Sequence, residues 1–186
     1  MDSMAQMLAT VVLTAVALAD IPTAAPVPIP FCVVIQNHAG VHREVLSHAI
    51  QIVTDVYRPL GIGVVWIEGP IQSPRMTTVD LSILSRNTGH EGARRIVGVE
   101  APTMPASGVH VAHVLYERVG TDDETGRALA YVISHLIAGV MRSYEPGIRP
   151  TIVTGDRRIA HRIANGGAIL TPEEVQAILA GIAAHK

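Results

Sequence analysis

The sequence has a single cysteine, few aromatic residues and almost no net charge. One cysteine in 186 residues excludes an intrachain disulfide, and it excludes a cysteine-based zinc site, which needs at least two thiolates at close spacing. Aromatic residues make up 3 % and apolar residues 48 %, so the core must be aliphatic and rich in alanine. The net charge of −2, with no basic stripe, provides no electrostatic basis for nucleic-acid binding.

The N-terminal region has the features of a secretory signal peptide. Residues 7–19, MLATVVLTAVALA, are apolar, too short to span a bilayer, and end in a small-x-small pattern before Asp20. No Lys or Arg precedes Arg43, so the positive charge of a signal peptide is missing, and an N-terminal extension is the alternative. We expect a signal peptide over 1–19, a Pro/Ala linker over 20–30 and one domain over 31–186. The protein would be secreted or periplasmic, without stable membrane insertion after cleavage.

Hydrophobic periodicity predicts an α+β domain in which strand and helix alternate early in the chain. Strands are expected at 31–36, 62–67, 79–84 and 109–119, and the RIVGVE segment at 95–100 is a further candidate strand. Helices are expected at 41–57, 127–142 and 156–164. A final helix begins at the TPEE segment, a capping box in which Thr171 accepts from the backbone and Glu174 reaches back. The helix over 127–142 has no strong polar face and should be buried.

That buried helix contains part of a zinc-protease motif. In HExxH, two His one helical turn apart bind zinc, and the Glu beside the first His is the general base. The same frame here reads YVISH. His135 stands at the second ligand position, Tyr131 at the first and Val132 at the general-base position. No residue of the chain can therefore be named as catalytic with this motif.

In order along the chain, four segments resemble a family of small secreted bacterial proteins with a zincin-like, metzincin-related metalloprotease fold. They are the strand–helix–strand ending in GIGVVWIE, the VAHVLYERV strand, the GRALAYVISHL helix and the NGGAILTPEEVQAI segment. The resemblance covers roughly residues 31–182. It implies a small mixed sheet with a long N-terminal helix, a buried active-site-type helix and small C-terminal helices.

The resemblance also implies that most of the zinc site is missing. In the family a third His and a Met follow the helix, and here Ser143 and Arg149 stand at those positions. One His of three remains, and a single imidazole cannot hold Zn²⁺ tightly against water. Without the metal and the carboxylate, water is neither acidified nor deprotonated. Glu145, ten residues after His135, is the most plausible substitute ligand, and Tyr131 would be a weak oxygen ligand.

The sequence therefore predicts a non-catalytic zincin-like protein, a pseudoenzyme that needs no cofactor. Its role would be to bind a peptide or protein ligand, through the cleft between the sheet and the helix at 127–142. The alternative is a divergent zinc-dependent hydrolase or peptidase that combines His135 with Glu145 or another His. A third possibility is a small α+β protein that resembles the family in fold only and has its function elsewhere on the surface.

Overall fold

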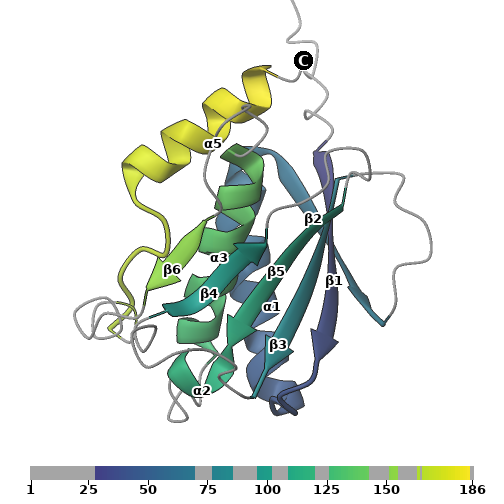
Figure 1. The fold of residues 1–186 in the computed structure, drawn as a ribbon. Coiled ribbons are helices and arrows are strands. Elements are labelled where there is room, and N and C mark those ends of the chain that lie inside the picture. Colours follow the sequence, from purple (N-terminus) through teal and green to yellow (C-terminus); the bar gives the residue numbers. More distant parts are fainter. Residues whose placement is uncertain are drawn as a thin grey trace, which may run out of the picture.

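The computed structural model describes residues 28–69, 77–85, 96–101, 109–119, 126–142, 151–154, 163 and 165–184. Within these ranges the chain forms an α+β domain with a mixed sheet, as predicted (Figure 1). The strands are β1 (Ile29–Asn37), β2 (Ile62–Glu68), β3 (Thr78–Leu84), β4 (Ile96–Ala101), β5 (Val109–Leu115) and β6 (Ile152–Thr154). The helices are α1 (Arg43–Tyr57), the 3-10 turn η1 (Arg58–Leu60), α2 (Tyr116–Val119), α3 (Arg127–Arg142) and α5 (Pro172–Ala184).

The six strands lie in the order β2-β1-β3-β5-β4-β6. β1 pairs in parallel with β2 and β3, and β3 pairs in parallel with β5. β4 runs antiparallel to both β5 and β6. The chain of parallel strands requires crossovers, and α1 supplies the one between β1 and β2.

The main core lies between the sheet and two helices, α1 and α3, which pack on the same face (Figure 1). Alternate residues of the central strands point toward these helices, because side chains alternate across a strand. Val33, Leu81 and Ala112 are such residues, and each is 1 % exposed or less. α5 packs against the C-terminal half of α3, at His135 and Met141. Together with α1 and the sheet it buries α3 along almost its whole length, as the sequence of this helix predicted.

Most predicted elements are confirmed, and one is partly wrong. The strand expected over 109–119 ends at Leu115, and the next four residues form the short helix α2. The pairing explains this end: Leu115 lies opposite Leu84, the last residue of β3, so no strand remains to continue the parallel ladder. The short strand β6 was not predicted, and the basic helix expected over 156–164 lies almost entirely outside the described residues.

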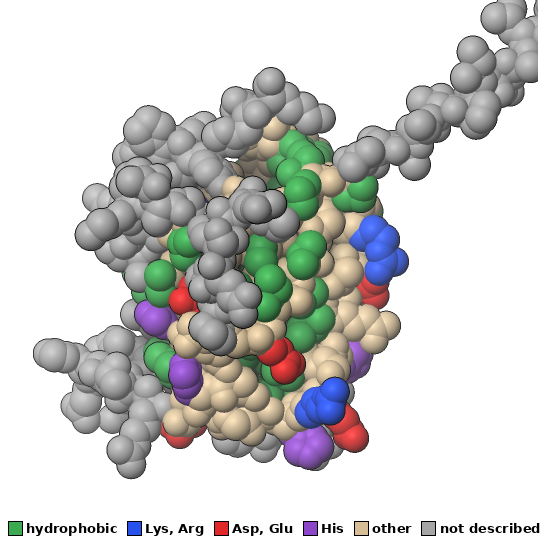
Figure 2. Space-filling view, turned by 90° about the vertical axis from the view of Figure 1, so that its right-hand side faces the viewer, with side chains coloured by type: hydrophobic (Ala, Val, Ile, Leu, Met, Phe, Trp, Pro, Cys, Tyr) green, Lys and Arg blue, Asp and Glu red, His purple; other side chains and the backbone are tan. Residues whose placement is uncertain are grey.

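Hydrophobic side chains also reach the surface, and several are visible in the view of Figure 2. Val65 and Ile67 of the edge strand β2 are 43 % and 44 % exposed. Cys32, the single cysteine of the chain, is buried. Among the described residues, no helix combines the length and the apolar character that crossing a membrane requires. The predicted signal peptide and most of the linker lie outside the described residues.

Candidate functional site on helix α3

α3 is held against α1 and the sheet at points where a side chain would not fit. Gly126, immediately before α3, has a φ of +68°, and a Cβ there would come within 2.3 Å of the Val45 carbonyl oxygen on α1. A glycine is therefore needed both for the backbone conformation and for the close approach. The amide of Ala130 donates to the Gly126 carbonyl and starts the helix. The close approach of Gly126 to α1 fixes where α3 begins and therefore where residues 131–135 lie.

Val132, at the general-base position of the zinc-protease frame, is part of the core. It is 2 % exposed and faces Gly98 of β4. A Cβ on Gly98 would lie 2.7 Å from Val132 Cγ1 and 3.2 Å from Leu136 Cδ1, so the helix touches the strand backbone directly. The space beneath residue 132 is therefore filled by aliphatic side chains.

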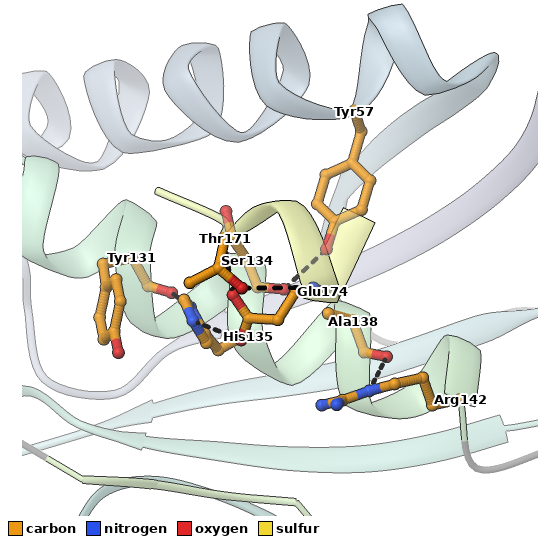
Figure 3. A network of polar contacts seen from close by, with 8 residues as sticks. All are labelled: Tyr57, Tyr131, Ser134, His135, Ala138, Arg142, Thr171 and Glu174. Atoms are coloured by element: carbon orange, nitrogen blue, oxygen red, sulfur yellow. Dashed lines mark hydrogen bonds and ion pairs between the residues drawn. The ribbon is translucent and has the colours of Figure 1, made fainter. Parts of the chain in front are cut away.

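His135 has both ring nitrogens engaged by the protein (Figure 3). Nδ1 lies 2.9 Å from the Tyr131 carbonyl oxygen, and Nε2 lies 3.0 Å from Oε1 of Glu174 on α5. A carbonyl oxygen can only accept, so Nδ1 carries a hydrogen and donates it. Nδ1 therefore donates to the backbone while Nε2 faces the Glu174 carboxylate, and both ring nitrogens contact oxygen atoms of the protein.

Tyr131, at the first lost ligand position, packs against the imidazole of His135. The two ring centroids are 4.0 Å apart with an interplanar angle of 42°, and Tyr131 is 8 % exposed. One helical turn brings the two side chains together, as the HExxH spacing requires. Tyr131 and His135 are thus i, i+4 neighbours on α3 that are joined by an aromatic contact.

Glu174 is the residue of this site that the sequence did not identify. The predicted capping box is confirmed: the Thr171 amide donates to Glu174 Oε2 at 2.8 Å, and the Glu174 amide donates to Thr171 Oγ1 at 3.3 Å. The other carboxylate oxygen, Oε1, faces His135, with side-chain exposures of 20 % for Glu174 and 13 % for His135. Glu174 therefore caps its own helix and binds α5 to α3. The capping box predicted only the first role, because the contact with His135 joins two helices that are far apart in the sequence.

Two further polar groups lie beside this pair. The buried Tyr57 hydroxyl of α1 donates to the Ser134 carbonyl at 2.7 Å (Figure 3). Burial raises the pKa of Tyr57 far above its ordinary value, and the negative charge of Glu174 raises it further. Arg142 and the Ala138 backbone oppose this rise only in part. The Ser134 hydroxyl is fully buried and, among the residues that the structure describes, it has no hydrogen-bond partner.

Within the described ranges, no three His, Cys, Asp or Glu residues converge on one point where a metal ion could sit. A second His–carboxylate pair exists on the sheet, where His110 Nδ1 lies 3.7 Å from Glu100 Oε1. His113 points to the opposite face, as expected for a residue three positions along a strand. Ser143 and Glu145, the third ligand position and the proposed substitute ligand, lie outside the described residues.

The chain was compared with known protein families and with curated proteins. No family model and no curated protein matches it.

Proposed function

We propose that this chain is a non-catalytic zincin-like protein, secreted or periplasmic, that binds a peptide or protein ligand. The observation that carries the proposal is the state of His135, the one remaining ligand of the zinc-protease frame. Its two ring nitrogens are engaged by Tyr131 and Glu174. The carboxylate of Glu174 occupies the place beside Nε2 where a metal ion would be coordinated.

The architecture supports the fold part of the proposal. The segments that resemble the zincin-like family form β1–α1–β2, then β5 before α3, then the start of α5. Their order and the burial of α3 agree with what the resemblance implies. The apolar block over residues 7–19 supports export.

The chemistry supports the absence of catalysis. A hydrolytic zinc needs three protein ligands and an open position for water, and its water needs a base to take the proton. Position 132 offers an isopropyl group packed on Gly98. No carboxylate can reach a bound water from that position without displacing the core.

Two measurements on the purified full-length protein test the proposal. Elemental analysis should find zinc well below one equivalent, and a peptide library should show no chelator-sensitive cleavage. His135→Ala should change neither result. One equivalent of zinc that is lost in His135→Ala would refute the metal-free interpretation.

One observation favours the alternative, a divergent zinc-dependent hydrolase. Two ligands of a single tetrahedral zinc ion lie about 3 Å apart, and His135 Nε2 and Glu174 Oε1 are separated by 3.0 Å. On this alternative Glu174, together with a residue such as Glu145, completes the ligand set. It predicts that Glu174→Gln and His135→Ala each abolish zinc binding and hydrolysis, whereas the pseudoenzyme has neither to lose.

A further inference from the structure

A hollow of about 700 Å³ opens at the carboxyl ends of β1 and β2, beside the start of α1. This volume is within the range of small-ligand sites, roughly 300–1,000 Å³. In open sheets with parallel strands, ligands bind outside the carboxyl ends of the strands. The hollow is lined from β1, β2 and α1, and none of the α3 residues discussed above contributes to it.

The hollow has an apolar floor. Three of its lining residues, Ile35, Val41 and Leu46, are 3 %, 5 % and 5 % exposed. They come from the end of β1, the connection to α1 and the first turn of α1. Such a floor favours a ligand with an aliphatic part.

The rim carries one charge of each sign. Arg43 is the first residue of α1, and Glu68 is the last residue of β2, opposite Ile35 in the parallel pairing. Both side chains are exposed, and within the described part of the chain neither has a hydrogen-bonded or ion-paired partner. Arg58, at the other end of α1, is by contrast ion-paired with Asp55. The two charges on the rim are therefore available to a ligand.

The polar part of the lining, which we call the wall and which consists of Gln36, Asn37 and His38, is held by hydrogen bonds. Asn37 donates to the Val41 carbonyl and accepts from the Val41 amide, both at 2.9 Å. Gln36 donates to Asp80 at 2.7 Å, and its amide oxygen lies 3.1 Å from His38 Nε2, which donates to it. A wall fixed in this way loses little conformational entropy when a ligand binds.

We propose that this hollow binds short zwitterionic peptides with aliphatic side chains. The terminal carboxylate lies on Arg43, the terminal ammonium group lies on Glu68, and the aliphatic side chains cover the floor. This assignment rests on the proposed binding role and gives it a location and a ligand class. It places the binding site at the end of β1 and β2, instead of in a cleft beside α3, where Val132 and Leu136 fill the space against Gly98.

The test is a titration of the ¹⁵N-labelled full-length protein with the dipeptide Leu-Leu, followed by amide NMR shifts. We expect saturable shifts for the wall residues. Leu-Leu amide, which lacks the carboxylate, and acetyl-Leu-Leu, which lacks the ammonium group, should each bind at least about tenfold more weakly, since each loses one charge-assisted contact.

Variants assign each terminus to its partner. Arg43→Gln should weaken Leu-Leu at least about tenfold and leave the affinity for Leu-Leu amide unchanged, because the amide has no carboxylate to lose. Glu68→Gln should likewise weaken Leu-Leu at least about tenfold, and it should leave the affinity for acetyl-Leu-Leu unchanged, because that peptide has no ammonium group to lose. Glu44→Gln, which removes a charge next to Arg43 but outside the lining, and Arg58→Gln, at the other end of α1, should bind Leu-Leu like the unmodified protein.

Two outcomes overturn the assignment. One is the absence of saturable shifts up to about 10 mM Leu-Leu. The other is equal weakening of all three peptides by Arg43→Gln or Glu68→Gln, which would indicate a structural effect. These outcomes are distinct from failure of the proposed function, which would appear as stoichiometric zinc with chelator-sensitive hydrolysis in separate measurements.

Discussion

Introducing a glutamate at position 132, which is the general-base position of the HExxH frame, should damage the fold without creating a metal site. Val132→Glu removes a side chain that is 2 % exposed and places a carboxyl group between α3 and Gly98 of β4. Loss of the buried valine costs about 1.5–3 kcal/mol. Burying a carboxyl group without a partner costs roughly 2 kcal/mol or more even when it is protonated. We therefore expect the free energy of unfolding to fall by at least about 3.5 kcal/mol.

Urea denaturation of Val132→Glu, followed by circular dichroism, measures this loss. Val65→Glu is the matched control, because it introduces the same group at a position on β2 that is 43 % exposed, and it should change stability by less than about 1 kcal/mol. Tyr131→His combined with Val132→Glu restores HExxH in sequence, and we expect no zinc binding from it. A stable double variant that binds one zinc ion would refute the assignment of Val132 to the core.

Three other predictions concern groups around α3. Tyr57 keeps its proton in the folded state to higher pH than in the unfolded chain, where the pKa is about 10. The unfolded state therefore loses the proton first, and the free energy of unfolding should fall above about pH 10 by up to roughly 1.4 kcal/mol per pH unit. Tyr57→Phe should reduce this slope in alkaline unfolding curves. An unchanged slope would contradict the raised pKa of Tyr57. Gly98→Ala should destabilise by about 1–3 kcal/mol, because its Cβ would lie 2.7 Å from Val132 Cγ1, and a neutral result in thermal unfolding would show that α3 is not in contact with β4. Ser134→Ala should leave the free energy of unfolding unchanged or raise it by about 1 kcal/mol, since the buried hydroxyl has no hydrogen-bond partner in the described part of the chain. A clear loss of stability would reveal a partner for that hydroxyl.

Local patterns in the sequence predicted most helices and strands, whereas the arrangement of side chains around His135 depends on contacts between residues far apart in the sequence. The bounds of α3 and the capping box before α5 are both confirmed, because periodicity and capping depend on neighbours within a few residues. The contact of Glu174 with His135 joins residues on two helices and has no local signal. The contact between Gly98 and Val132 is equally non-local.

Short elements were the other source of error. β6 has three residues, too few for a recognisable alternation, and its pairing with β4 depends on a partner more than fifty positions away. α2 begins where β5 no longer pairs with β3. The sequence of residues 109–119 alone does not indicate where this pairing ends. Both errors come from pairing between strands, which the pattern along a single strand does not specify.

We infer that the His135 side chain is held by Glu174 and the Tyr131 carbonyl and that neither ring nitrogen binds a metal ion. The ¹⁵N spectrum of the His135 imidazole, recorded before and after addition of one equivalent of zinc, tests this inference. We expect hydrogen-bonded ring nitrogens whose signals zinc does not shift, and a changed Nε2 signal in Glu174→Gln. A zinc-dependent shift of Nε2 in the unmodified protein would contradict it.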